Sequence, residues 1–563
     1  MLLDRWRSSP GCALPVGRSA PAVAEDLPVA RWPRILRSGP PVYLDGGSRR
    51  IRVSAAGVAV WLIIAGVLAD FQLPPGVLPA ASTARSLSPG APAAILRAVW
   101  TPAALAALAT ALVRGGQGLR ALPDAALLDA WTAAVEAFLD PGSPERRELE
   151  SPLAALCGLS AAGLDAGLAA VLGGVRRRPA AALLERAAVR EAAHGEARGA
   201  LLADALLADA CPAPTADGRV AVVDAGQEAP EAAVQGPVLV VLASNLPALA
   251  VQPLLPALAL RRPVLLKSPT VEPLFAPAFV AALARREPRL AGALAAVTWP
   301  GGDAALEAPL LAAAGTVVAY GGSEALADLE RRAAGRRFVG YGPKVSVAAI
   351  DLGDGGASAA TLAAGLARDV ALFDQRGCLS VVAVYVAGGS GEAARFAAML
   401  EAALSDLAVQ WPPGPAALAA LAAVQQARLE AELRGLPCPT LPPAAGTVLL
   451  EPEPALRPSP GLRTVRVHPL PGLDRLPEIL APWRGRLQGA ALAGAAAWRL
   501  EPRLGELGIS RFAAPGDLQS PDASWHNGGI DPLLALTLLG QARRRTRPEL
   551  SDQDCQTRGE RNA

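Results

Sequence analysis

The sequence predicts an α/β protein in which a doubly wound parallel sheet follows a helical N-terminal region. After Gly236, short apolar runs alternate with longer helical patterns as far as Ile350. Before that, residues from about 96 to 210 carry leucine and alanine at three- and four-residue spacing, as amphipathic helices do. The chain of 563 residues is 52% hydrophobic and 18% charged, which is ample for several domain-sized cores.

Residues 1–95 differ from the rest and are predicted to form an atypical extension. They are rich in proline and arginine, and their sustained apolar run, residues 53–69, follows Arg49, Arg50 and Arg52. At about 17 residues the run is at the short limit for a membrane span, and it begins too far into the chain for an ordinary signal peptide. We expect a buried or misassigned N-terminal extension here in preference to a membrane anchor.

The elements that follow are assigned from periodicity and turn residues. The helical region contains patterns at 102–113, 124–139, 164–172 and 179–192. Beyond it, strands are predicted at 237–243, 264–267, 296–299, 316–320, 338–341 and 345–350, with helices at 249–260, 275–285, 304–314 and 323–334. Strands that alternate with helices predict a parallel sheet, and such sheets bind ligands at the carboxyl ends of their strands.

Composition excludes several classes of function. The formal net charge is only +2, so no nucleic-acid surface is indicated. The six cysteines are scattered without a CxxC pair, which argues against a disulfide framework or a metal site and favours a reducing cytoplasm. The tail 541–563 is charged and poor in apolar residues, so we expect it to be disordered.

Scarce polar residues gather at the predicted strand ends. The chain has only two lysines, Lys267 and Lys344, and Asn245 is one of three asparagines. Asn245 follows the first strand and Lys267 ends the second. The turn Tyr320–Ser323 opens a helix with Gly321, Gly322 and Ser323; it suits a phosphate, although plain helix capping explains it equally well.

A cysteine in a polar turn is the candidate nucleophile. Cys378 lies in the stretch FDQRGCLS, directly before the valine-rich run 381–387. A small buried hydrophobe is the ordinary fate of a free cysteine. Toward the C-terminus, His526 stands beside Asn527 in a glycine turn. Two roles are open for His526: a proton donor or a structural residue of the turn.

Taken together, the segments ASNLP (243–247), LLKSP (265–269), YGGS (320–323), GPK (342–344) and FDQRGC (373–378) resemble, in order and spacing, the aldehyde dehydrogenase superfamily. The phrases FDQRGCLS, LRTVRVHPL (462–470) and LGISRFAAPGDLQSPDASWHNGG (507–529) are most similar to its acyl-CoA reductase branch, which includes the long-chain fatty acyl-CoA reductase of bacterial bioluminescence. The resemblance covers roughly 115–535.

The resemblance implies two doubly wound sheet domains and a set of roles. It divides the chain into the extension 1–95, a helical region 96–210, an NADP-binding Rossmann-like domain 211–344, a catalytic domain 345–490, a C-terminal segment 491–540 that returns to the cofactor and oligomerisation region, and the tail 541–563. Cys378 would be the nucleophile and Asn245 would stabilise the oxyanion, with His526 as a candidate proton donor. Residues on the cofactor side would be Lys267, Ser268, Thr270, Gly321, Gly322, Ser323 and Lys344.

Two departures from the family pattern bear on the reaction. Oxidising members carry a glutamate base four residues before the lysine that matches Lys344, where this chain has Gly340. Without a base, an acyl-cysteine survives to receive a hydride instead of being hydrolysed. Thr270 stands where NAD-preferring members often carry a ribose-binding glutamate, which favours NADPH and leaves NADH as the alternative.

The resemblance therefore implies a cytoplasmic oxidoreductase that reduces an acyl-CoA, of fatty acyl type, to an aldehyde with NADPH. It also implies self-association into a homo-oligomer and an acyl-transferring protein as a partner. Two alternatives stay open. One is an aldehyde dehydrogenase or acyl-phosphate reductase of the same fold, and the other is a non-catalytic binding subunit of an acyl-transfer complex.

Overall fold

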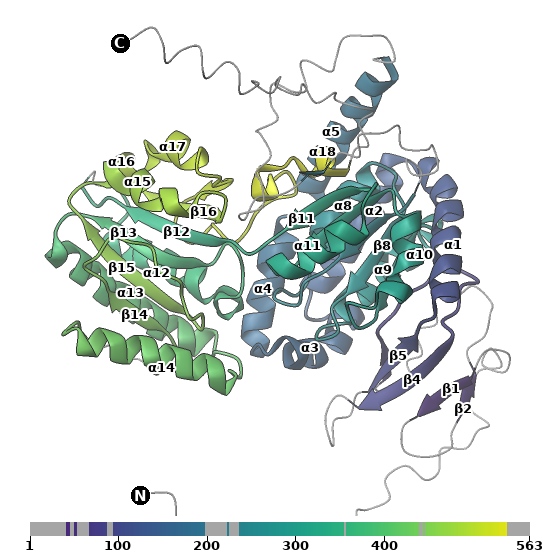
Figure 1. The fold of residues 1–563 in the computed structure, drawn as a ribbon, viewed down its shortest axis with the longest axis horizontal. Helices are drawn as coiled ribbons and strands as arrows, with labels where there is room; N and C mark the ends of the chain where they lie inside the picture. The colour runs from purple at the N-terminus through teal and green to yellow at the C-terminus, as the bar shows by residue number, and fades with distance from the viewer. Residues whose placement is uncertain are drawn as a thin grey trace, which may run out of the picture.

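The computed structural model describes residues 41–44, 50–52, 67–86, 94–196, 222–223, 236–353, 356–437, 442 and 445–536. The described chain contains two six-stranded sheets and a five-stranded sheet. Figure 1 shows the two six-stranded sheets in separate lobes, joined where β11 (Arg337–Tyr341) leads into β12 (Val345–Ile350). The predicted tail 541–563 and most of the apolar run 53–69 lie outside the described residues.

The first six-stranded sheet confirms the predicted alternation of strands and helices. Its strand order is β6-β11-β10-β7-β8-β9, and every pair is parallel except β11 with β6. Its other strands are β6 (Val222–Val223), β7 (Val238–Val241), β8 (Val264–Ser268), β9 (Leu294–Thr298) and β10 (Thr316–Tyr320). The connecting helices are α8 (Val251–Ala259), α9 (Phe275–Arg286), α10 (Ala304–Ala313) and α11 (Ser323–Arg332).

The second six-stranded sheet is parallel throughout, with the order β14-β15-β13-β12-β16-β17. Along β12, Ala348 and Ile350 enter one core, whereas Val347 and Ala349 enter the core on the opposite face, as the two-residue period of a strand requires. Its strands and helices are β13 (Val381–Ala387), β14 (Thr447–Leu450), β15 (Thr464–Leu470), β16 (Leu487–Ala493), β17 (Arg511–Ala513), α12 (Ala359–Ala371), α13 (Ser390–Gln410), α14 (Leu418–Leu433), α15 (Leu476–Leu480), α16 (Ala495–Trp498) and α17 (Glu501–Gly505).

Within the described residues 94–196 there are five helices, and a side-chain hydroxyl caps the start of three of them. Thr101, Ser143 and Ser160 each accept a backbone N–H three residues on, at the starts of α1, α3 and α4, which satisfies one otherwise unpaired donor. The helices are α1 (Pro102–Arg120), α2 (Asp124–Leu139), α3 (Pro144–Cys157), α4 (Ala161–Gly173) and α5 (Arg177–Glu196). At the other end of the described chain, α18 (Pro532–Leu536) packs against α8.

The segment predicted as an atypical extension contributes a five-stranded sheet in the order β2-β1-β4-β5-β3. Its strands are β1 (Pro41–Leu44), β2 (Arg50–Arg52), β3 (Val67–Ala69), β4 (Ala81–Ser86) and β5 (Ala94–Val99). Because β5 ends at Val99, the boundary expected at residue 96 falls inside a strand. These strands are short, and β4 reads ASTARS, so no apolar alternation revealed them.

A search of the described helices for membrane spans found no single helix that is both long and apolar enough. One bent pair, Pro144–Cys157 with Ala161–Arg190, meets the length and composition criteria together across a bend of 103°.

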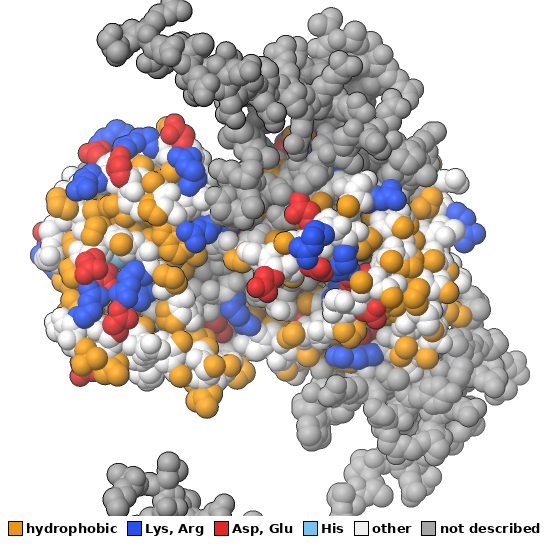
Figure 2. All heavy atoms as spheres, viewed as in Figure 1, with side chains coloured by type: hydrophobic (Ala, Val, Ile, Leu, Met, Phe, Trp, Pro, Cys, Tyr) orange, Lys and Arg blue, Asp and Glu red, His pale blue; other side chains and the backbone are white. Residues whose placement is uncertain are grey.

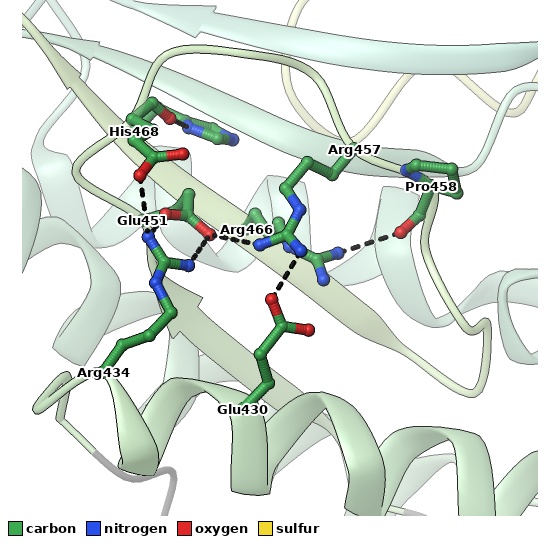
Figure 3. A network of polar contacts seen from close by, with 8 residues as sticks. Glu430, Arg434, Glu451, Arg457, Pro458, Arg466 and His468 are labelled. Carbon is green, nitrogen blue, oxygen red and sulfur yellow. Dashed lines mark hydrogen bonds and ion pairs between the residues drawn. The ribbon is translucent and has the colours of Figure 1, made fainter.

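A network of arginine and glutamate side chains ties α14 to the strands β14 and β15 (Figure 3). The buried carboxylate of Glu451 accepts hydrogen bonds from Arg434 at 2.7 and 2.9 Å and from Arg457 at 3.3 Å. Arg466 donates to the carbonyl of Pro458 at 3.0 Å. The network therefore fixes the segment 451–458, which leads into the wall of the candidate site described below.

His468 lies fully buried beside this network, and its titration predicts acid sensitivity. Its Nδ1 is 2.6 Å from the carbonyl of Glu453, and its ring stacks on Tyr385 at 4.8 Å. Burial lowers the pKa of His468 from 6.5 to about 4. Since the unfolded chain then takes up the proton first, stability is complete above pH 6.5 and falls by up to about 3 kcal/mol as the pH drops toward 4.

We expect the variant His468→Phe to lack this component of the pH dependence. Urea unfolding of both proteins at pH 7.5 and 5 measures it: the wild type should lose more stability between the two pH values than the variant. Equal losses would show that His468 does not titrate as its burial implies.

Candidate active site

A cavity of about 760 Å³ lies where the two six-stranded sheets meet. Segments that follow β7 and β10 line it from one lobe, and segments that precede β12, β13, β15 and β16 line it from the other. The carboxyl edge of the first sheet thus faces the amino edge of the second. Its size is that of a typical small-molecule site, and it contains Cys378, Asn245, Gly321, Gly322 and Lys344.

The loop before Cys378 adopts an unusual backbone. Phe373, Asp374 and Gln375 have φ values of 55°, 50° and 65°, a left-handed region that residues with a β-carbon rarely enter and that persists only when surrounding contacts impose it. The Phe373 ring packs so tightly on α4 that a β-carbon at Gly167 would lie 2.4 Å from it.

Buried polar contacts hold this nucleophile loop, residues 373–378. Arg463 donates from Nε to Asp374 Oδ1 at 2.9 Å, and its Nη2 lies within ion-pair distance of the same oxygen at 2.7 Å. Gln375 donates to the carbonyls of Val381 and Thr464 at 2.9 and 2.7 Å and accepts the N–H of Thr464 at 2.8 Å. The loop is therefore fastened to the start of β15, which neighbours β13 in the sheet.

Cys378 is partly buried, and its surroundings act on the thiol in opposite directions. Burial raises the pKa of the Cys378 thiol to about 11, while the backbone N–H of Cys378, the Lys344 ammonium and the N–H of Leu379 lower it. Burial likewise lowers the pKa of Lys344, and the Cys378 thiolate raises it. The two groups thus favour each other's charged form, and Lys344 supplies the positive charge that a thiolate nucleophile needs.

Charges in the cavity are of one sign. Its lining includes Lys344, Arg376 and Arg486, and no aspartate or glutamate stands among the lining residues of the described chain. At Gly340 a β-carbon would lie 2.9 Å from the Phe338 ring and 3.7 Å from Leu326. That side of β11 faces α11, so a side chain at position 340 would point toward α11. None of the described residues that line the cavity is a carboxylate that could serve as a base.

Asn245 lies against the nucleophile loop. Its side-chain Nδ2 donates to the carbonyl of Arg376 at 3.0 Å, and Arg376 in turn donates to the carbonyls of Phe373, Cys157 and Gly158. The structure therefore brings Asn245 and Cys378 into one cavity, with the amide held by a residue two positions before the cysteine.

The other predicted cofactor residues lie farther along the carboxyl edge of the first sheet. The buried Lys267 has its Nζ 5.9 Å from the Trp299 ring centre, and in the described chain no carboxylate lies within ion-pair distance of it. The hydroxyl of Ser268 is buried and has no hydrogen-bond partner among the residues that the structure describes. Neither residue lines the cavity, and neither does the adjacent, partly buried Thr270.

This edge fits a dinucleotide. From the cavity outward the neighbouring strands are β10, β7 and β8, so polar groups run from Gly321 to Lys267 along one line. Gly322 precedes α11 without any side chain capping the helix, which leaves the first N–H groups available to a phosphate. The exposed Ser323 does not line the cavity.

His526 lies apart from the thiol. Its side chain is 51% exposed, its Nε2 is 3.5 Å from Asp531 Oδ2, and it is absent from the cavity lining, which its neighbours Trp525 and Asn527 join. Asp531 also pairs with Arg186 and Arg190. Asp531 also accepts the backbone N–H groups of Leu533 and Leu534 at the start of α18, so the neighbour of His526 is itself held by structural contacts.

Several cavity residues carried no signal in the sequence. Tyr320 and Tyr341 stack at 4.8 Å, and burial, then Tyr341 and the Cys378 thiolate, raise the pKa of Tyr320 well above 10. Gln519 accepts a hydrogen bond from Ser380 at 3.3 Å. Tyrosine at a strand end is an ordinary core residue, so Tyr341 did not stand out, and Tyr320 was noted only as the first residue of the segment YGGS.

Because Lys344 lies beside the thiol, we expect Lys344→Met to raise the thiol pKa and slow alkylation of Cys378 at pH 8 by about tenfold per pKa unit. Iodoacetamide modification across pH, followed by mass spectrometry, measures the effect. Lys344→Arg should retain most of the reactivity, and Lys267→Met, the chain's other lysine, is the matched control. An unchanged profile in Lys344→Met would remove the lysine from this role.

The profile of the acyl-CoA reductase (LuxC) family matches residues 227–539. A comparison with curated proteins gave no match. Among solved structures, an indole-3-acetaldehyde dehydrogenase complexed with NAD⁺ superposes with a TM-score of 0.55 and 16% identity, over 85% of this chain and 95% of its own. HpcC from Thermus thermophilus superposes with a TM-score of 0.55 and 13% identity, over 83% of this chain and 90% of its own.

A bifunctional proline utilization A (PutA) protein gives a TM-score of 0.54 and 17% identity over 78% of this chain. The alignment spans 43% of the PutA chain, so this protein matches less than half of that relative's length. At these identities the superpositions establish the fold, and the family profile covers more than half of the chain. The protein therefore belongs to the LuxC family of acyl-CoA reductases, oxidoreductases that act on aldehyde or acyl groups, and it has the aldehyde dehydrogenase fold.

Proposed function

We propose that the protein reduces an acyl-CoA thioester, of fatty acyl type, to the aldehyde with NADPH, through an acyl-cysteine at Cys378. The observation that carries this proposal is the cavity itself, in which a cysteine lies beside Lys344 and the described lining residues include cations but no carboxylate. A positive cavity suits two phosphate-rich ligands. The absence of a carboxylate base from it disfavours hydrolysis of the acyl-enzyme.

In the first half of the reaction, the nucleophile loop supplies the attacking thiolate and one of the two oxyanion donors. The Cys378 thiolate, stabilised by Lys344, attacks the carbonyl carbon of the thioester. The electron pair of the C=O bond moves to oxygen, where the backbone N–H of Cys378 and the amide of Asn245 donate to it. Collapse of this oxyanion breaks the bond to the CoA sulfur, which leaves as a thiolate and takes a proton from solvent.

The second half requires a hydride, which a bound nicotinamide cofactor supplies to the acyl carbon. Asn245 and the N–H of Cys378 again hold the oxygen while it is negative. When this second oxyanion collapses, the C–S bond to Cys378 breaks, the aldehyde leaves, and the thiolate returns to its pair with Lys344. Lys267, Ser268 and the start of α11 would hold the cofactor, and Thr270 in place of a carboxylate favours a 2′-phosphate.

The test is to measure CoA release, NADPH oxidation and aldehyde formation together, over a series of acyl chain lengths. Equal amounts of all three support the reductase, and the preferred length identifies the substrate. CoA release without NADPH oxidation would indicate an acyl-transfer enzyme instead. Activity confined to acyl phosphates, or NAD⁺-dependent oxidation of aldehydes with water, would indicate another enzyme of the fold.

If the purified protein binds acyl-CoA but consumes neither reactant at any chain length, the reductase proposal fails and the binding-subunit alternative replaces it. We also propose a homo-oligomeric state, a cytoplasmic location and an acyl-transferring protein as a partner. The location follows from the scattered cysteines, and the other two follow from the family resemblance.

A further inference from the structure

An arginine stacked on a tryptophan forms part of the cavity wall and has no role in the scheme above. The guanidinium carbon of Arg486 lies 4.7 Å from the centre of the Trp483 ring, and both residues line the cavity that contains Cys378. Arg486 is exposed. It donates to the carbonyl of Pro482 at 3.0 Å, and within the described chain no carboxylate lies within ion-pair distance of it.

The backbone holds this pair in place. Arg486 N–H donates to the carbonyl of Trp483 at 2.8 Å, and the carbonyl of Arg486 accepts the N–H of Val345 at 3.0 Å. Between them Gly485 has a φ of 79° and donates to the carbonyl of Leu507 at 3.0 Å. Arg486 is thus presented from a hydrogen-bonded turn with its side chain stacked, so little side-chain freedom remains to be lost on binding.

The position of Arg486 relative to the thiol follows from the sheet. The strands β16, β12 and β13 are neighbours in that order, and Arg486, Lys344 and Cys378 stand just before them. Neighbouring strands lie about 4.8 Å apart, so the starts of β16 and β13 are roughly 10 Å apart, with Lys344 between them at the start of β12. Cys378 lies in the turn three residues before β13. Arg486, which has no carboxylate partner in the described chain, therefore lies about two strand spacings from the start of the strand that follows the nucleophile loop, on the cavity side.

We propose that Arg486, supported by Trp483, binds the phosphate on the nicotinamide side of the cofactor's pyrophosphate. This rests on the proposed function and adds to it a residue for cofactor binding. Guanidinium groups bind phosphate oxygens through paired N–H donors. In a nicotinamide nucleotide a single ribose separates the reacting ring from its first phosphate, whereas in CoA the whole pantetheine arm separates the sulfur from the pyrophosphate. The short separation between Arg486 and Cys378 favours the first ligand.

The opposite wall of the cavity agrees with this assignment. Gly321 and Gly322 line the cavity at the start of α11, where free N–H groups and the helix dipole also favour an anion. A pyrophosphate between them and Arg486 would be neutralised from both lobes. Figure 2 shows that on the surface in view acidic and basic side chains are interspersed, in contrast to the single sign of the charges in the cavity.

The chain contains a matched control two residues away. Arg484 is also exposed, but it donates to the carbonyl of Glu506 and does not line the cavity. Arg486→Ala and Arg484→Ala therefore remove the same charge from the same turn, once inside the site and once outside it. Trp483→Leu tests the support, because it leaves Arg486 without its stacking surface.

The experiment is calorimetric titration of NADP⁺ and, separately, of CoA into the full chain carrying Cys378→Ala, so that no turnover occurs. We expect Arg486→Ala to weaken NADP⁺ binding about tenfold, the scale of one charge-assisted hydrogen bond, and Trp483→Leu to weaken it less. Arg484→Ala should leave NADP⁺ binding unchanged, and CoA binding should be the same in all variants. Thermal unfolding of each variant shows that it is folded.

Two results would overturn the inference. Equal NADP⁺ affinity in Arg486→Ala and Arg484→Ala would remove Arg486 from the cofactor site, and loss of CoA affinity in its place would assign the arginine to the substrate's phosphates. The proposed function fails by a different measurement, the absence of NADPH oxidation in the wild type. A protein that binds NADP⁺ through Arg486 without reducing acyl-CoA would therefore keep the inference and lose the function.

Discussion

Cys378→Ala is expected to abolish both CoA release and NADPH oxidation, lowering each by about 10⁴-fold or more, because a covalent mechanism has no path without its nucleophile. Incubation of the wild type with acyl-CoA in the absence of NADPH should add one acyl group to the peptide that contains Cys378. Intact-protein mass spectrometry, followed by peptide mapping, detects the adduct. The variant should remain unmodified.

Cys157 is the matched control, because the described chain contains one other free cysteine. It is buried, burial raises the pKa of its thiol far above the usual range, and it does not line the cavity. Cys157→Ala should therefore leave acylation intact. Acylation that persists in Cys378→Ala and disappears in Cys157→Ala would refute the assignment of the nucleophile.

Arg463→Met is expected to have the second largest effect, on both stability and the reactivity of the thiol. The change removes the closer charge partner of the buried Asp374 carboxylate and leaves it with Arg376, whose Nη2 is 4.0 Å from Oδ2. Breaking a buried pair costs about 3–5 kcal/mol, and Arg376 offsets part of that loss. Asp374 has a left-handed backbone and lies between the end of α12 and Cys378. When Arg463 no longer holds the Asp374 side chain, the nucleophile loop can relax from this conformation. We expect a lower unfolding free energy and a slower, heterogeneous alkylation of Cys378.

A double variant distinguishes the effect of losing the whole ion pair from the effect of leaving one buried charge unpaired. Arg463→Met with Asp374→Asn removes both charges and should recover part of the stability that Arg463→Met loses. Arg331→Met is the control for a surface pair, since Arg331 and Asp328 are 70% and 46% exposed and such pairs contribute about 1 kcal/mol or less. If Arg463→Met is no more destabilising than Arg331→Met, the Arg463–Asp374 pair does not stabilise the nucleophile loop.

The first sheet could be predicted because its strands are continuous valine and leucine runs buried on both faces, such as β7 and β8. That is the pattern of parallel strands covered by helices. The N-terminal strands could not, because some have only three residues, as β2 and β3 do, and β4 is largely polar. Such a strand forms because of its contacts with neighbouring strands in the sheet. Those pairings cannot be read from a single sequence.

In the candidate site, the cysteine and the residues at strand ends were predictable from chain position, but their partners were not. Arg463 contacts Asp374 across 89 residues, and nothing local marks Phe373, Asp374 and Gln375 for a left-handed backbone that glycine usually adopts. Arg486 is one arginine in a chain where 53 residues are basic. Its role depends on the neighbouring strand that brings it beside Lys344.

The scarcity of lysine has a chemical consequence for an enzyme whose proposed product is an aldehyde. Aldehydes form Schiff bases with neutral amines, whereas the arginine guanidinium stays protonated. The described surface carries arginine as its cation, and both lysine side chains of the chain are partly or fully buried. The released product therefore meets few side-chain amines that can capture it, and a hydride reductant such as cyanoborohydride should leave the protein largely unlabelled during turnover.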